Sequence, residues 1–136
     1  MIGALVFWLI ILGLAAICGC GYSGDDVPRP YYFRRCEGRR WKKQFPEVPK
    51  EEIRRFLSIF VDAFGFREKD RLKFGPDDRI GDVYKAVYGP HPFCDGLEIT
   101  SLFCDVEDTY SVDLEDGNAM DMTLGALFRS AIESKR

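Results

Sequence analysis

Few residues in this chain have the type and spacing that catalysis needs. His91 is the only histidine, and it stands between two prolines with no partner residue in a catalytic spacing. The segment 19–24 matches GxGxxG only formally, because it follows no strand and opens no helix. The cysteines, which show no paired CxxC spacing and predict neither a disulfide framework nor a zinc site, are Cys18, Cys20, Cys36, Cys94 and Cys104. Without a nucleophile–base pair, a metal cluster or a phosphate loop, the sequence predicts a protein that is not an enzyme and uses no cofactor or metal.

The remaining candidates for chemistry are carboxylates on a predicted helix over 97–110. Glu98, Asp105 and Asp108 follow each other at spacings of seven and three residues. They fall on the side opposite an apolar stripe at helical spacing, formed by Ile99, Leu102, Phe103, Val106 and Tyr110. These acids are either a solvated surface or a docking surface for a basic protein partner.

The charges are strongly segregated along the chain, although the net charge is only −3. Arg29 to Lys43 holds seven bases and one acid, whereas Asp95 to Met122 holds nine acids and no base. This separation predicts that one end of the protein faces anionic lipid and the other faces a basic partner.

Helical periodicity dominates the C-terminal two thirds of the 136 residues. A helix that begins at Pro49 and ends at Gly65 has an apolar stripe formed by Ile53, Phe56, Leu57, Phe60, Val61 and Phe64. We expect Asp77 and Asp78 to cap a second helix that ends at Gly89, and Thr123 to cap the last one. No strand-like alternation is present, so the fold class is all-α, with one helical domain over 49–136.

The N-terminal segment, residues 1–20, is predicted to be a transmembrane anchor or a lipoprotein signal. Ile2 to Gly19 carries no charged side chain, and a helix of this length spans roughly 27 Å, close to a hydrocarbon core. The Lys and Arg residues of the chain all follow this apolar run. This order predicts retention in a bacterial inner membrane with the C-terminal domain in the cytoplasm. A cleaved signal and a lipoprotein anchored at Cys20 are the alternatives.

Residues 21–48 are predicted to be a basic, irregular juxtamembrane linker. They combine three prolines and several glycines with bases and aromatic residues. Beside a membrane-spanning helix, bases and aromatics suit the anionic headgroup layer. The predicted partner of residues 2–20 and of this linker is therefore a membrane and not nucleic acid.

Three stretches of the sequence resemble acyl carrier proteins, in the same order. Asp95-Gly96-Leu97-Glu98 is similar to their Asp-Ser-Leu, the stretch 106–114 to Leu-Glu-x-x-Phe-Gly-Ile-x-Ile, and Thr123-Leu124-Gly125 to Thr-Val-Gly. The chain is also similar to short bacterial acyl-carrier-like proteins known as domain of unknown function number 1493. The resemblance implies a four-helix acyl-carrier-like bundle in which Gly96 occupies the place of the phosphopantetheine serine. It also implies that Glu98, Asp105 and Asp108 dock a partner.

Three functional hypotheses follow. The first is a membrane-tethered, non-catalytic acyl-carrier-like adaptor that binds through its acidic helix without a phosphopantetheine arm. The second is a small immunity-type protein that protects against a bacterial toxin, and the third is a carrier modified at another residue. A lipoprotein of unknown role is a further alternative.

Overall fold

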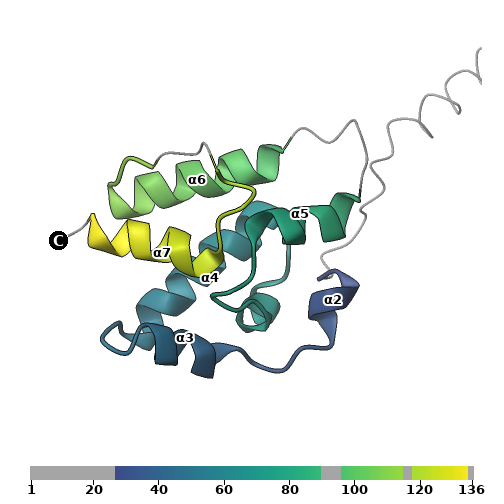
Figure 1. The fold of residues 1–136 in the computed structure, drawn as a ribbon, viewed down its shortest axis with the longest axis horizontal. Coiled ribbons are helices and arrows are strands. Elements are labelled where there is room, and N and C mark those ends of the chain that lie inside the picture. Colours follow the sequence, from purple (N-terminus) through teal and green to yellow (C-terminus); the bar gives the residue numbers. More distant parts are fainter. Residues whose placement is uncertain (1–26, 90–95, 115–117, 135–136) are drawn as a thin grey trace, which may run out of the picture.

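The computed structural model describes residues 27–89, 96–114 and 118–134, and these residues confirm the all-α fold class. Four predicted helices are present as α4 (Lys50–Phe64), α5 (Ile80–Tyr88), α6 (Leu97–Tyr110) and α7 (Leu124–Glu133). Three short helices were not predicted: α2 (Arg29–Tyr32), α3 (Gly38–Gln44) and the 3-10 helix η1 (Glu68–Lys73). Figure 1 shows α6 and α7 side by side along one edge of the domain, with α3 at the opposite edge.

The longest helix, α4, is the centre of the packing. All six residues of its predicted stripe are buried, and Gly65 ends it in a left-handed conformation. The helix packs against α6 and against η1. Its apolar stripe is thus covered on two sides, which explains why so many large residues occur at helical spacing in one segment.

The prediction of an irregular linker over 21–48 is wrong for its described part, 27–48. Two helices form there, and Tyr31 and Trp41 are buried in the core. Trp41 is fully buried, packs against Phe45, Phe56 and Phe128, and donates a hydrogen bond from Nε1 to the Phe74 carbonyl oxygen at 2.8 Å. Burying these rings against the core outweighs their suitability for a headgroup layer. The structured domain therefore begins before residue 49.

The starts of α5 and α7 are held together by backbone hydrogen bonds. Arg79 and Thr123 form an isolated bridge, and the Ile80 amide donates to the Met122 carbonyl at 3.0 Å. The backbone approaches so closely that a Cβ on Gly81 would lie 2.3 Å from the Met120 carbonyl oxygen. A residue with a side chain does not fit at this position without moving the backbone.

Of the two predicted N-terminal helix caps, one is confirmed and the other is wrong. Thr123 caps α7 as predicted, since its side chain accepts a hydrogen bond from the Ala126 amide at 3.1 Å. The prediction that Asp77 and Asp78 cap α5 is wrong, because the N-cap residue is Arg79. Asp78 Oδ2 instead accepts hydrogen bonds from the Gly75 amide at 2.7 Å and from Arg34 Nη1 at 2.6 Å. That carboxylate ties the segment after α2 to the loop before α5.

No helix within the described ranges is long and apolar enough to cross a membrane. The segment predicted as an anchor or signal, 1–20, and Cys20 within it lie outside these ranges. The same holds for His91 and Cys94.

Candidate functional site

Gly96, which was predicted to occupy the place of a carrier protein's serine, is the N-cap residue of α6. Its φ of 71° lies in the left-handed region that favours glycine. Its amide donates to the Tyr84 hydroxyl at 3.0 Å, and its carbonyl accepts from Ile99 and Thr100. The local backbone thus supplies its own reason for glycine here, independent of the resemblance.

Glu98 differs from the other two predicted docking residues in its burial and in having a hydrogen-bond partner. It is half-buried, and its carboxylate accepts a hydrogen bond from the Tyr88 hydroxyl on α5. Because this contact joins α5 to α6, Glu98 links two helices of the domain. Its carboxylate is less available to a partner than a fully exposed one.

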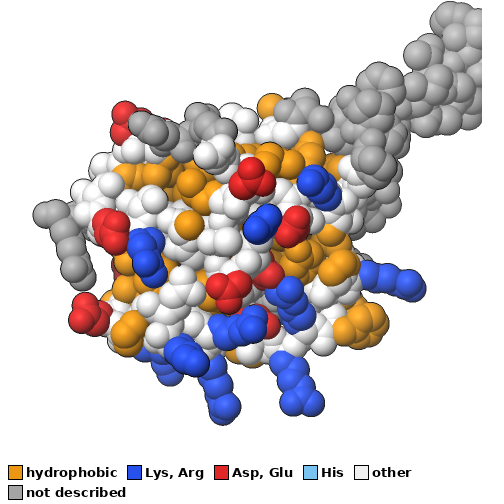
Figure 2. Space-filling model, viewed as in Figure 1, with side chains coloured by type: hydrophobic (Ala, Val, Ile, Leu, Met, Phe, Trp, Pro, Cys, Tyr) orange, Lys and Arg blue, Asp and Glu red, His pale blue; other side chains and the backbone are white. Residues whose placement is uncertain are grey.

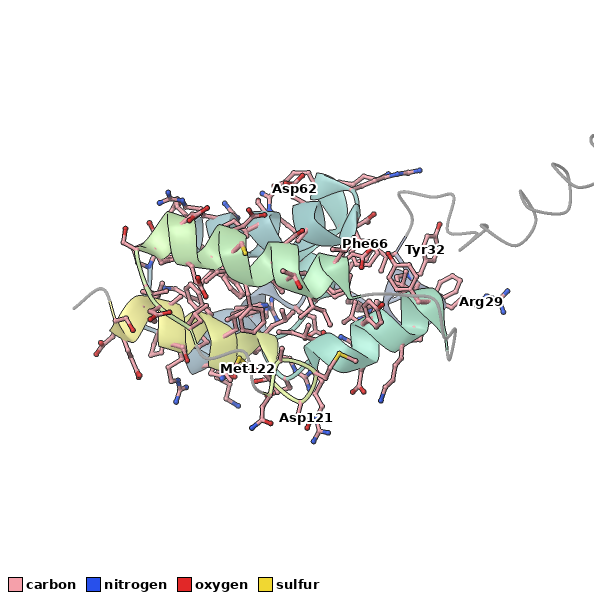
Figure 3. The ribbon with its side chains drawn as sticks, turned by 90° about the horizontal axis from the view of Figure 1, so that it is seen from above. Arg29, Tyr32, Asp62, Phe66, Asp121 and Met122 are labelled. Atoms are coloured by element: carbon pink, nitrogen blue, oxygen red, sulfur yellow. The ribbon has the colours of Figure 1, made fainter. Side chains whose placement is uncertain are left out.

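Asp105 and Asp108 are exposed, and they line one groove between α6 and α4. The groove is shallow and widely open to solvent, with a volume of about 470 Å³. The opposite wall includes Asp62 of α4, shown beside α6 in Figure 3, and Glu68 of η1. We call these four carboxylates and their surroundings the acidic groove; its other lining residues are Arg55, Ser58, Ile59 and Thr109.

Within the described ranges, three of the four carboxylates in the acidic groove have no ion-pair partner. Glu68 accepts hydrogen bonds from Arg71 Nη1, at 2.7 Å, and from the Ser58 hydroxyl. Arg55 lies 3.9 Å from Glu52, which competes for its charge. Among the described residues, Asp62, Asp105 and Asp108 form no ion pair or side-chain hydrogen bond. The groove therefore presents a local negative field to solvent.

Asp62 and Glu68 were not predicted as site residues. Arg55, Ser58 and Asp62 follow the i, i+3, i+7 spacing of a polar stripe on α4. That spacing indicates one exposed face, but it does not reveal which helix lies alongside. Only the packing of α4 against α6 brings Asp62 next to Asp105 and Asp108.

Four of the eight residues that line a second concavity are bases of α3 and α4. Figure 2 shows Lys and Arg side chains gathered along the lower edge of the domain, where α3 runs in Figure 1. Arg39 and Lys42 of this concavity belong to the basic run in the sequence, but Lys50 and Arg54 do not. The segregation along the chain is thus also a segregation in space, with the bases around α3 and the acids on α6.

Within the described ranges, no group of three or more His, Cys, Asp and Glu side chains is placed to hold a metal ion. Burial raises the pKa of Tyr110, at the end of α6, to about 12, so this hydroxyl stays protonated near neutral pH.

Comparison of the chain with protein-family models, with curated proteins and with solved structures finds no match.

Proposed function

We propose that this chain is a non-catalytic adaptor that docks a basic protein partner in the acidic groove. The observation that carries the proposal is the convergence of Asp62, Asp105 and Asp108, from two helices, on one groove, with no neutralising partner among the residues that the structure describes. Unpaired like charges on one surface repel one another, and an opposite charge relieves that repulsion. A complementary basic segment also gains a faster encounter from the field.

The groove favours a segment that carries Lys or Arg on an otherwise apolar surface. Ile59 lies half-buried in the groove and provides apolar contact between the carboxylates. Ser58 and Thr109 add hydroxyl groups. Arginine suits such a site well, because its planar guanidinium pairs with carboxylates in a bidentate geometry.

We further propose that α4 to α7 form an acyl-carrier-like bundle without a phosphopantetheine arm, tethered at a bacterial inner membrane. The order of the three motifs supports the bundle, and the uncharged run over residues 2–19 supports the tether. The domain would then face the cytoplasm, where the acidic groove is open to proteins. A lipoprotein anchored at Cys20 is the alternative form of the tether.

The test is capture of partners by the full-length protein in neutral detergent. The variant Asp62→Asn/Asp105→Asn/Asp108→Asn removes the three unpaired charges of the groove. Its matched control, Asp77→Asn/Asp113→Asn/Asp121→Asn, removes three exposed charges elsewhere. The Asn side chain is nearly isosteric with Asp, so we expect both variants to keep the wild-type helical spectrum.

We expect the groove variant to bind a captured partner about ten- to thirty-fold more weakly than wild type, because each exposed charge contributes less than about 1 kcal/mol. The loss should be mainly in the association rate and should shrink as salt increases. The control variant should bind as wild type does. Equal binding and equal salt response of the groove variant would mean that the groove is only a solvated surface.

A further inference from the structure

A pocket of about 280 Å³ opens between α3, the first two turns of α4 and η1. Its floor is apolar and consists of Ile53, which is buried, and Leu72, which is half-buried. Its rim carries Arg39, Lys42, Lys50 and Arg54. We call this site the basic pocket. Its volume is just below the usual range for small-molecule sites, which suits a ligand no larger than a headgroup.

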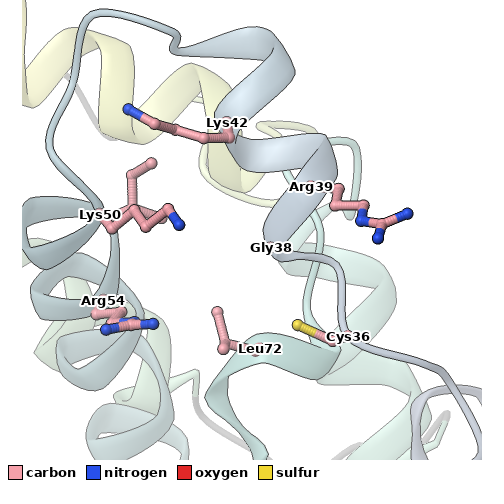
Figure 4. Close-up of a pocket in the computed structure, with 8 residues that line it drawn as sticks. Cys36, Gly38, Arg39, Lys42, Lys50, Arg54 and Leu72 are labelled. Atoms are coloured by element: carbon pink, nitrogen blue, oxygen red, sulfur yellow. The ribbon is translucent and has the colours of Figure 1, made fainter.

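The cations of the basic pocket have different orientations, as Figure 4 shows. Lys50 and Arg54, both from α4, extend toward Leu72 and Cys36. Lys42 points toward the loop before α4, where its Nζ donates to the Val48 carbonyl at 2.6 Å. Arg39 extends outward from α3. Lys50 and Arg54 therefore supply the charge inside the pocket, whereas the Arg39 side chain extends away from them.

Three cations that line the basic pocket have no partner within the part of the chain that the structure describes, whereas Lys42 does. Among the described residues, Arg39, Lys50 and Arg54 form no ion pair or side-chain hydrogen bond. The bases that pair with a carboxylate of the described residues include Arg34, Arg40, Arg55, Arg71 and Lys73. Lys50 and Arg54, beside an apolar floor and without a neutralising partner among the described residues, are complementary to an anion that carries an apolar body.

An exposed aromatic pair lies close to the pocket. Phe33 is 81% exposed and Tyr32 is 48% exposed, and their rings contact each other edge to face. Phe33 precedes Cys36 of the pocket by three residues, so the two Cα atoms are at most about 11 Å apart. Exposed aromatic side chains next to bases are typical of residues at the headgroup layer of a membrane.

We propose that the basic pocket binds the phosphate headgroup of an anionic phospholipid. In this site Lys50 and Arg54 bind the phosphate oxygens. The glycerol and the first carbons of the acyl chains lie on Ile53 and Leu72. This site is separate from the acidic groove and adds a specific lipid contact to a domain whose proposed protein partner binds elsewhere.

The exposed Cys36 thiol at the edge of the pocket provides the readout. The full-length protein in neutral detergent is alkylated in the presence of dihexanoyl phosphatidic acid, and the rate at each cysteine is measured by peptide mass spectrometry. Cys104, exposed on α6, is the internal reference. At ten times its dissociation constant the lipid leaves about a tenth of the sites free, so Cys36 should react up to about ten-fold more slowly. The rate at Cys104 should not change.

The variant Arg39→Gln/Lys50→Gln/Arg54→Gln removes the unpaired cations and leaves Lys42 to hold its loop. We expect this variant to need at least about 30 times more lipid than wild type for the same protection of Cys36, because charge-assisted hydrogen bonds to the phosphate are lost. The control Lys43→Gln/Lys69→Gln/Lys85→Gln makes the same charge change at exposed bases outside the pocket and should behave as wild type. Circular dichroism establishes that each variant is folded.

Three comparison ligands decide between sources of the anion. Dihexanoyl phosphatidylcholine, which has no net charge, should not protect Cys36, and neither should glycerol 3-phosphate or inorganic phosphate at the same concentration. Equal protection by phosphatidylcholine would overturn the role of charge. Equal protection by glycerol 3-phosphate or phosphate would show a site for soluble phosphates and overturn the lipid proposal, as would no protection by any ligand.

Discussion

Tyr110 has a buried hydroxyl without a hydrogen-bond partner among the described residues. The residue is 2% exposed, and its Oη makes no hydrogen bond. A buried polar group without a partner costs stability. We expect Tyr110→Phe to raise the free energy of unfolding by about 1 kcal/mol at pH 7, measured by urea denaturation. Tyr32→Phe, at an exposed hydroxyl, is the matched control and should change it by less than about 0.5 kcal/mol.

The same tyrosine gives the domain a predictable response to alkali. Burial, the main cause, raises the pKa of Tyr110 from 10.0 to about 12. The unfolded chain therefore loses this proton at lower pH than the folded one. Ionisation of Tyr110 therefore does not affect the free energy of unfolding below about pH 10. Above that pH the unfolded chain ionises first, so the free energy of unfolding falls as the pH rises to about 12. Over this window the stability of wild type should fall more than that of Tyr110→Phe; equal slopes would mean that the hydroxyl is in water.

At the scale of elements, the segment 27–48 is part of the core. Trp41→Ala should therefore lower the free energy of unfolding by roughly 3–5 kcal/mol, because a fully buried indole and its hydrogen bond to the Phe74 carbonyl oxygen are lost. Phe33→Ala, on the same segment but 81% exposed, should change it by less than about 0.5 kcal/mol. Denaturation followed by circular dichroism measures both. A cost below about 1 kcal/mol for Trp41→Ala would contradict docking of this segment.

At the scale of the whole molecule, the two charged surfaces lie on different parts of the domain. The bases gather around α3 and the unpaired acids lie between α4 and α6. A domain held at an anionic membrane by its basic surface leaves its acidic groove available to a protein. In one orientation of the domain, the basic pocket can therefore contact the membrane while the acidic groove binds the proposed protein partner.

The proposed orientation predicts where the C-terminus lies. Alkaline phosphatase fused after Arg136 should be inactive, because the enzyme needs an oxidising compartment to form its disulfides. A cytoplasmic reporter fused at the same residue should be active and is the control. High phosphatase activity would place the domain outside the cytoplasm and favour the lipoprotein anchored at Cys20.

Periodic apolar residues were enough to predict the four main helices. The stripes of α4 and α6 are buried as expected, because the 3.6-residue period alone determines which side chains share a helix face. Gly65 and Thr123 end and begin their helices as predicted, since left-handed backbone and N-capping depend on one residue and its immediate neighbours. The all-α class follows from the same local information.

The sequence by itself thus determined the helices, their apolar faces and the separation of charge along the chain. Only the tertiary structure decided which helices are neighbours, because that depends on contacts between residues far apart in the sequence. Trp41 is a core residue owing to Phe56, Phe74 and Phe128, none of which is near it in the chain. For the same reason, Asp62 joins the acidic groove and Lys50 and Arg54 join Cys36 and Leu72 in the basic pocket, whereas Glu98 pairs with Tyr88.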